Sequence, residues 1–174
     1  MRERGFTLVE LLVVIAIIGI LSSVVYNSVT GARLKAKQVA ALAQLKEFRN
    51  AFNSLALDTS FWPGREALAG TPDPQPMDTV RCGAINNEVQ DLADPQSGLL
   101  VDSPDYPGWK GPYLEVVPKD PWGNNYFFDT NYDIPPTGDN IFGAVIGSYG
   151  PNGVGNNLYD GDDIIDILAQ TTCP

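Results

Sequence analysis

The chain has 174 residues, enough for one domain with a hydrophobic core and too few for two large domains. Its formal net charge of −10 argues against a nucleic-acid partner, because phosphate binding needs a basic face, and favours divalent cations as companions. The sequence contains no histidine, which excludes His-based catalytic triads, His-ligated zinc and the commonest general base.

The first predicted element is an apolar segment, residues 6–25, of about 20 residues. As a helix, this segment crosses roughly 30 Å of hydrocarbon. A secretory signal peptide is the alternative, but Glu10 lies inside the run, and a central acid costs about 2.5–3.5 kcal/mol on insertion scales. The segment therefore predicts a membrane-spanning helix in which Glu10 needs a partner.

The stretch Gly5-Phe6-Thr7-Leu8-Val9-Glu10 resembles the processing signature of type IV pilins and type II secretion pseudopilins. The resemblance implies that a prepilin peptidase cleaves between Gly5 and Phe6, so that residues 1–5 are a leader, and methylates the new amine of Phe6. That amine can meet Glu10 of another subunit in a growing filament. Such a buried pair selects the axial stagger, because a wrong stagger leaves a bare charge in hydrocarbon.

Residues 26–58 are predicted to continue the helix with an amphipathic pattern. One face carries the large apolar side chains of Leu42, Leu45, Phe48, Phe52 and Leu55, with Ala41 and Ala56 on the same arc. A second arc carries Ala32, Ala36, Val39, Ala40 and Ala43, which form either a less buried flank or a surface for close packing between subunits. Pseudopilins often have a proline just beyond the apolar run. Here no proline interrupts residues 6–57, and only Gly19, Gly31 and the serines at 22 and 23 soften the helix.

The helix is predicted to end near Asp58-Thr59, before the Pro63-Gly64 pair. Residues 55–70 resemble the pseudopilin segment in which the long helix ends and a short second helix begins. Residues 70–108 have no recognised counterpart in the compact major pseudopilin. They are interpreted as an insertion that is mostly loop, with a short helix around Glu88–Ala93.

The two cysteines, Cys82 and Cys173, are too far apart for a CxxC redox motif and too few for a zinc site. In an exported chain they are expected to form one disulfide that closes a loop of about 90 residues and stabilises the fold by about 4–5 kcal/mol. In a cytosolic chain they would be two unrelated thiols. The disulfide would tether the insertion.

Residues 59–174 are expected to form a globular head. Within residues 109–128, the stretches Gly-Pro-Tyr-Leu and Pro-Lys-Asp-Pro-Trp-Gly-Asn are similar to the entry into the sheet of the major pseudopilin. Strands are predicted at Tyr126–Phe128, Phe142–Tyr149 and Ile164–Leu168. The expected fold class is α+β, with one long N-terminal helix packed on a small antiparallel β-sheet.

The loop at residues 150–163 contains four glycines, three asparagines and three aspartates, a composition that suits a hard cation with oxygen ligands. The spacing is not that of an EF-hand. The loop resembles the calcium loop of major pseudopilins, although a solvated acidic turn is the alternative. Asn152 is a neutral amide at an early acidic position, which should weaken binding. The resemblance implies calcium ligands at Asn152, Asp160, Asp162 or Asp163, and the carbonyl near Tyr149.

These features predict a structural filament subunit and no enzyme, closest to the major pseudopilin of type II secretion. The resemblance implies a homo-oligomeric helical filament that assembles from the inner membrane into a periplasmic pseudopilus for protein export. Implied partners are the prepilin peptidase, an inner-membrane assembly platform with its cytoplasmic ATPase, minor pseudopilins and, before assembly, membrane lipid. A single-pass anchor with its head in the periplasm is expected.

Two alternatives stay open. A type IV pilin that forms a surface fibre for adhesion, motility or DNA uptake is favoured by the cysteines, because a disulfide at the C-terminal end is a pilin habit. A membrane-anchored enzyme would use Asp160 and Asp162 as a hydrolytic pair. The lack of histidine and the Gly/Asn-rich loop disfavour the enzyme.

Overall fold

The computed structural model describes residues 7–67, 82, 88–155 and 161–173, and the chain divides into two compact units, Met1–Lys37 and Gln38–Pro174. The elements, in chain order, are α1 (Leu8–Thr59), β1 (Phe61–Trp62), the 3-10 turn η1 (Pro63–Arg65), β2 (Glu66–Ala67), the 3-10 turn η2 (Pro95–Ser97), β3 (Tyr126–Asp133), β4 (Ile141–Ser148) and β5 (Ile164–Thr172).

In the first unit, the described residues form the beginning of α1, and their side chains are exposed. This stretch is long and apolar enough to cross a membrane. The helix continues unbroken through Gly19 and Gly31, around which there is open space. A single glycine costs a helix only about 1 kcal/mol relative to alanine, so neither position ends it.

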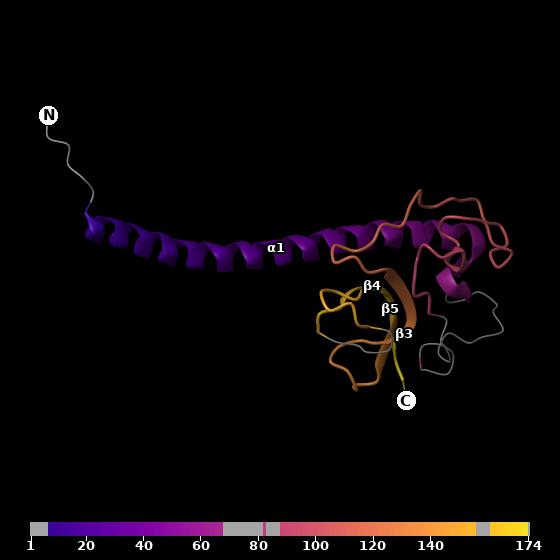
Figure 1. Cartoon of the computed structure of the whole chain (residues 1–174). Helices are drawn as coiled ribbons and strands as arrows, with labels where there is room; N and C mark the ends of the chain where they lie inside the picture. Colours follow the sequence, from indigo (N-terminus) through magenta and orange to yellow (C-terminus); the bar gives the residue numbers. More distant parts are fainter. Residues whose placement is uncertain (1–6, 68–81, 83–87, 156–160, 174) are drawn as a thin grey trace. The chain divides into compact units, whose positions relative to one another are not determined.

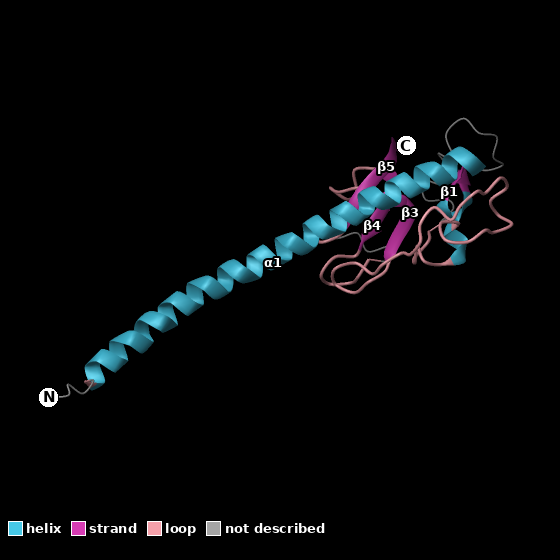
Figure 2. Ribbon diagram, turned by 90° about the horizontal axis from the view of Figure 1, so that it is seen from above, coloured by secondary structure: helices cyan, strands magenta, loops and turns pink. Residues whose placement is uncertain are grey.

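In the second unit, the last turns of α1 lie across an antiparallel sheet with the order β3-β4-β5 (Figures 1 and 2). The ring of Phe48 packs edge-to-face on Tyr126, with centroids 4.9 Å apart. Phe52 packs in the same way on Phe128 at 5.2 Å. This geometry is favourable for aromatic rings beyond the area they bury. The α+β class and the three predicted strands are confirmed; β3 and β5 are longer than the sequence pattern indicates, and β4 is shifted by one residue.

The helix also has a polar tie to the sheet. Arg49 on α1 donates from Nε to Oδ2 of Asp166 at 2.6 Å and from Nη2 to the carbonyl of Ile167 at 2.8 Å. A second bond joins Nη2 to Oδ1 of Asp166, so the guanidinium and the carboxylate pair through two bonds. Because such a pair requires a defined orientation of both side chains, it sets where α1 crosses β5.

The predicted buried face of α1 is confirmed with one exception. Leu42 is 44% exposed and lies at the edge of that face. The buried residues of α1 are Ala41, Leu45, Phe48, Ala51, Phe52, Leu55, Ala56 and Thr59. The second arc of Ala32, Ala36, Val39, Ala40 and Ala43 is exposed. Its role in packing between subunits stays a prediction.

The short second helix expected after α1 is absent from residues 61–67. Strands β1 and β2 instead pair as a small antiparallel hairpin around η1. Gly64 has a positive φ of 69°, a conformation that glycine adopts without strain. The Pro-Gly pair therefore makes a tight reversal here.

The predicted helix around Glu88–Ala93 is wrong. Val89 and Phe128 exchange two backbone hydrogen bonds of 2.8 Å, and the Leu92 amide donates to the Tyr126 carbonyl at 3.0 Å. The backbone of this segment is thus paired with the edge of β3 and cannot form helical bonds at the same time. The helical turn lies further on, at Pro95–Ser97, where proline at the first position and a capping aspartate favour it.

Residues 88–108 contribute several side chains to the core. Leu92, Leu99 and Tyr106 are buried in the same cluster as the aromatic residues of α1 and β3. The Tyr106 hydroxyl donates to the Gln96 carbonyl at 2.6 Å. Because these side chains share one core with α1 and β3, the segment is part of the folding unit. Residues 70–81 and 83–87 lie outside the described residues.

The predicted disulfide between Cys82 and Cys173 is confirmed, with a sequence separation of 91 and Cα atoms 5.6 Å apart. The Cys173 amide donates to the Asn140 carbonyl at 2.8 Å, which fixes the chain after β5 beside the loop between β3 and β4. The disulfide therefore ties the segment after β2 to the sheet.

The aromatic packing on α1 predicts a large cost for Phe52→Ala. The side chain is fully buried, so we expect its loss to lower the free energy of unfolding by about 3–5 kcal/mol, the usual range for a buried phenylalanine. Denaturant unfolding of the full chain in detergent measures this. Leu57→Ala on the same helix, where the side chain is 87% exposed, is the control and should change the value by less than about 0.5 kcal/mol.

Candidate functional site

The predicted assembly residues lie at the start of α1. Gly5 and Phe6 are outside the described residues, but Glu10 is in the first turn. Its Oε2 accepts from the backbone amide of Thr7 at 2.8 Å and from the Thr7 hydroxyl at 2.8 Å. The Glu10 amide in turn donates to the Thr7 hydroxyl at 3.2 Å. These reciprocal bonds are a capping box, which satisfies amide groups that the first turn of a helix leaves open.

The capping box changes the interpretation of Glu10. Its carboxylate has a partner within its own chain and sits where the helix dipole favours a negative charge. Both hydrogen bonds to the carboxylate end on Oε2, so Oε1 is the atom at which a donor from another chain can bind. The Thr-x-x-Glu spacing in the sequence is the signal for this arrangement, and it identifies Thr7 as a residue that positions Glu10.

The second predicted site is the loop after β4. Asp162 accepts from Asn152 at two atoms, from Nδ2 to Oδ1 at 2.7 Å and from the backbone amide to Oδ2 at 3.1 Å. The two ends of the loop approach closely, because a Cβ on Gly150 would lie 2.1 Å from the Asp162 carbonyl oxygen. Gly150 has a positive φ of 60°. The structure thus brings Asn152 and Asp162 together, and glycine is needed where the loop closes.

The other predicted ligands are placed differently. Asp163 accepts from the Tyr132 hydroxyl at 2.7 Å, which directs its Oδ2 toward the sheet and away from Asn152. The Tyr149 ring stacks on Phe127 with centroids 4.4 Å apart, and the carbonyl at this position stays a predicted ligand. Asp160 lies outside the described residues. Of the two register choices, the geometry therefore favours Asp162 over Asp163 as the residue that faces the loop.

The oxygen ligands that the loop offers are of the types that a hard cation prefers. Asp162 offers a carboxylate and Asn152 an amide oxygen, and calcium takes oxygen ligands of these types. In the part of the chain that the structure describes, which omits residues 156–160, no three His, Cys, Asp or Glu side chains are grouped to hold a metal. The Asn152 oxygen also accepts from the Val154 amide at 2.7 Å. Calcium binding here stays a prediction that depends on the contribution of Asp160.

The turn before β3 supports the loop. Asp120 is buried and accepts from the amides of Trp122 and Asn124 at 2.9 and 2.8 Å, and from the Ser148 hydroxyl at 2.6 Å. Asn124 then donates from Nδ2 to the Gly150 carbonyl at 3.1 Å. The sequence pattern indicates a turn here through its Asp and Asn residues, but not that Asp120 joins this turn to β4.

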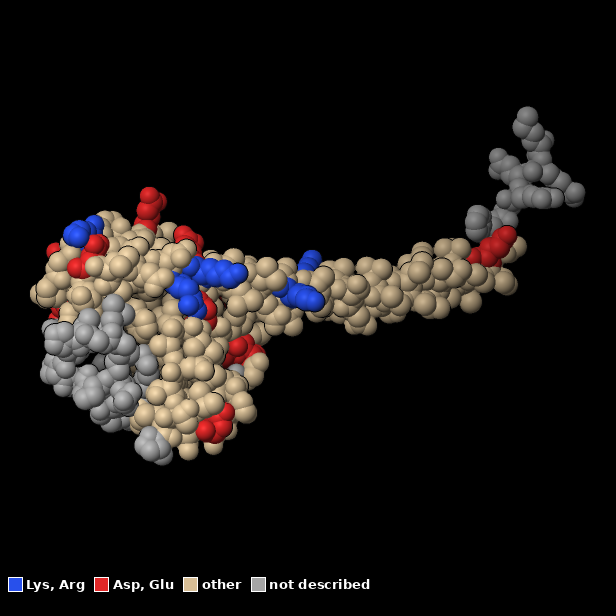
Figure 3. All heavy atoms as spheres, turned by 180° about the vertical axis from the view of Figure 1, so that it is seen from behind, with Lys and Arg blue, Asp and Glu red and all other residues tan. Residues whose placement is uncertain are grey.

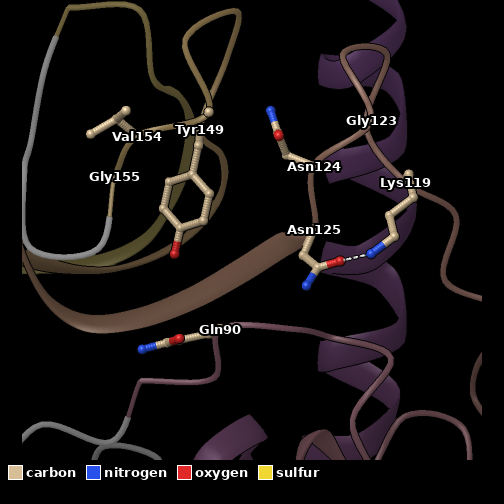
Figure 4. A pocket seen from close by; sticks show the side chains of 9 residues that line it. Gln90, Lys119, Gly123, Asn124, Asn125, Tyr149, Val154 and Gly155 are labelled. Carbon is tan, nitrogen blue, oxygen red and sulfur yellow. Dashed lines mark hydrogen bonds between the residues drawn. The ribbon is translucent and has the colours of Figure 1, made fainter.

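A pocket of about 580 Å³ opens between this turn and the loop (Figure 4). Lys119 donates to the amide oxygen of Asn125 at its rim. The residues that line the pocket are Gln90, Lys119, Gly123, Asn124, Asn125, Tyr149, Gly153, Val154 and Gly155. None of these nine described lining residues is an acid.

Asp129 on β3 is a buried acid with a shifted pKa. Burial raises the pKa of its carboxyl from 3.8 to about 6, against the lowering effect of the hydrogen bond from the Asn131 amide. The negative charge of Glu88 raises it further. The Asn131 amide donates to Oδ1 at 2.9 Å. Ionising the buried carboxyl therefore destabilises the folded state relative to the unfolded chain.

Comparison with known proteins gives a consistent result. Residues 1–26 match the family model described as "Prokaryotic N-terminal methylation motif", and residues 93–165 match "Type II secretion system (T2SS), protein G". The second match begins at residue 93, so the interpretation of residues 70–108 as lacking a counterpart is wrong for residues 93–108.

Several curated relatives carry the name "Type II secretion system core protein G". The protein from Vibrio cholerae is 32% identical over 129 residues, which cover 72% of this chain and 69% of that one. The protein from Aeromonas hydrophila is 33% identical over 125 residues, with 72% and 71% covered. The protein from Dickeya chrysanthemi is 29% identical over 171 residues, with 94% and 85% covered. Among solved structures, the major pseudopilin from the type 2 secretion system of enterohaemorrhagic Escherichia coli matches with a TM-score of 0.47 and 20% identity, covering 79% of this chain and 87% of that chain.

The buried Asp129 predicts a stability that falls as pH rises. Its folded pKa of about 6 lies above the unfolded value of 3.8, so the folded state binds the proton more tightly. Between these values, raising the pH removes that proton and should lower the free energy of unfolding by about 2–3 kcal/mol. Asp129→Asn should flatten this part of the curve of unfolding free energy against pH. An unchanged slope in the variant would contradict the assignment, and Asp102→Asn, an exposed site, is the matched control.

Proposed function

The chain belongs to the family of the type II secretion system core protein G, and on that premise we propose how this pseudopilin is anchored and assembled. As a member of the family it is a structural subunit and not an enzyme. We propose that it is held in the inner membrane by the first part of α1, with its head in the periplasm, before it joins a homo-oligomeric helical filament. The filament is the periplasmic pseudopilus that serves protein export.

The observation that carries this proposal is the exposure of the first part of α1. A run of large apolar side chains from Leu8 to Val29 is exposed to solvent, in a stretch long enough to cross a membrane. A surface of that size needs lipid or another subunit to cover it. The last turns of the same helix are the core of the head, so the element that anchors the subunit also supports its fold.

The proposed partners follow from the same premise. A prepilin peptidase would cleave between Gly5 and Phe6 and methylate the new amine, consistent with the match of residues 1–26 to a methylation motif. An inner-membrane assembly platform with its cytoplasmic ATPase would add the subunit to the filament, together with minor pseudopilins. Membrane lipid is the partner before assembly.

The disulfide was the feature that favoured a surface pilin. It is present, yet the curated relatives that the chain matches over 72% of its length are named as type II secretion proteins. A disulfide stabilises a head by restricting the unfolded chain, whichever filament the head belongs to. It therefore does not separate the two filament types, and the secretion assignment holds.

The capping box supports a proposed role for Glu10 in assembly. In a single subunit, Thr7 satisfies the Glu10 carboxylate through Oε2. In the filament, the methylated amine on Phe6 of another subunit would bind the same carboxylate. The charge is thus satisfied before and after assembly, and only a mispositioned subunit would leave that cationic amine unpaired.

Glu10→Gln separates the two functions of this side chain. Glutamine also serves in a capping box, so the start of α1 should stay helical, but the charge that pairs with the amine is lost. We expect filament formation in cells, measured by cross-linking between subunits, to fall at least tenfold. Intact mass of the membrane fraction should still give a chain that begins at a methylated Phe6.

Thr7→Ala is the matched control for this variant, because it removes the cap and keeps the charge. It should lower assembly less than Glu10→Gln does. Normal filaments from Glu10→Gln would contradict the pairing. A mass that lacks the whole apolar segment would instead show a cleaved signal peptide and overturn the membrane anchor.

We also propose that calcium binds the loop at residues 150–163 and stabilises the head. The support is the convergence of Asn152 and Asp162, the glycines that allow the loop to close, and an acidic composition that favours oxygen-ligated cations. Bound calcium would cross-link the two ends of the loop. The neutral Asn152 reduces the charge of the site, so weak binding is expected.

Calcium should raise the melting temperature of the full chain in detergent. A ligand at 100 times its dissociation constant stabilises by about 2.7 kcal/mol, which corresponds to several degrees for a domain of this size. Asp162→Asn should abolish the shift, whereas Asp102→Asn, an exposed acid outside the loop, should retain it. Equal melting temperatures with calcium and with a chelator would refute the proposal.

A further inference from the structure

Basic residues are concentrated just beyond the apolar part of α1. Residues 11–46 contain Arg33, Lys35, Lys37 and Lys46 and no acid, although the chain as a whole carries a net charge of −10. Figure 3 shows basic atoms grouped along the helix, separated from the acidic atoms near its beginning by an uncharged stretch. We name Arg33 and Lys35, both exposed, the basic collar.

The length of the helix places the basic collar at a membrane surface. Glu10 is charged and lies in the first turn of α1, so the end of the span that it occupies is at or near one interface. A hydrocarbon layer of roughly 30 Å takes about 20 helical residues, which sets the opposite boundary near Thr30. Arg33 and Lys35 follow within about 5–8 Å, which is the depth of the headgroup layer.

A shallow groove on the helix connects the apolar stretch to the collar. Its volume is about 490 Å³, and it runs from Leu21 through Val25 and Val29 to Arg33. Tyr26 also lines it, an amphipathic side chain of the type that is enriched at membrane interfaces. The Thr30 hydroxyl donates to the Tyr26 carbonyl at 2.9 Å, so this polar group is satisfied within the helix. The groove has an apolar wall for an acyl chain and a cation at its headgroup end.

We infer that the basic collar binds the headgroups of anionic phospholipids in the leaflet opposite the helix N-terminus. The occupant is an acidic lipid because its charge is complementary to the collar and its acyl chain fits the apolar groove that ends there. Exposed long basic side chains at a helix end extend toward headgroups while their stems stay against lipid. The inference rests on the membrane anchoring proposed above and adds the class of lipid.

The test uses the full chain in bilayers of phosphatidylcholine with spin-labelled phosphatidylglycerol or spin-labelled phosphatidylcholine. The ratio of the two association constants reports lipid selectivity. Each basic residue near the surface should favour the anionic lipid by about fivefold. We expect a ratio well above one, which falls about fivefold in Lys35→Gln and close to one in the double variant Arg33→Gln/Lys35→Gln. Raising the salt to 1 M should lower it as well.

Lys46→Gln is the matched control, because it removes the same charge from an exposed position on the same helix, about 17 Å further along. It should leave the ratio unchanged. A ratio of one in the wild type, or an equal drop in Lys46→Gln, overturns the inference. If the acidic head of a second copy occupies the collar instead, the ratio will be one and the double variant will lose cross-links between subunits.

Flotation of the same samples separates this inference from the membrane anchor. A chain that floats with the vesicles but shows a ratio of one refutes only the lipid selectivity of the collar. A chain that does not float with either vesicle refutes the membrane anchoring on which the inference rests.

Discussion

The rest of the structure depends on the packing of Phe48 and Phe52 of α1 against Tyr126 and Phe128 of β3. These four rings are buried and form the centre of the core cluster. They hold the last turns of α1 on the sheet, and the salt bridge between Arg49 and Asp166 fixes the crossing. Without this packing, the first part of α1 would have no folded head to carry, because an isolated helix is marginal in water and a sheet must bury its apolar face against another element.

Much of this fold can be predicted from periodicity. The apolar residues of α1 repeat with a helical period and the strands are rich in β-branched and aromatic residues, so local pattern and tertiary packing agree. The pattern does not predict that Leu42 is exposed, because an apolar repeat identifies a face of the helix but not how wide its buried part is. Residues 88–99 are different. Val89 and Leu92 look helical in spacing, and their role becomes clear only when the edge of β3 lies beside them. Long-range backbone pairing leaves no local signal.

The candidate site is predictable in composition and less so in geometry. The sequence indicates a loop rich in oxygen donors, but not that Asp162 faces Asn152 while Asp163 faces Tyr132. The two acids are adjacent in the segment before β5 and have different partners, so a register ambiguity of one residue exchanges their roles. Likewise, the Thr-x-x-Glu spacing in the sequence indicates a cap, but not that both hydrogen bonds from Thr7 end on Oε2 of Glu10.

The position of Glu10 changes the energetic argument about its charge. A carboxylate at the centre of a bilayer is expensive, but this one lies in the first turn of α1, about 35 Å along the helix from Arg33. That separation slightly exceeds the hydrocarbon thickness of roughly 30 Å, so both charges can reach the two interfaces at once. On the proposed anchoring, the acid and the basic collar would fix the depth of a single subunit. In the proposed filament, Glu10 would leave the interface, and an amine from another chain would then be needed to balance its charge.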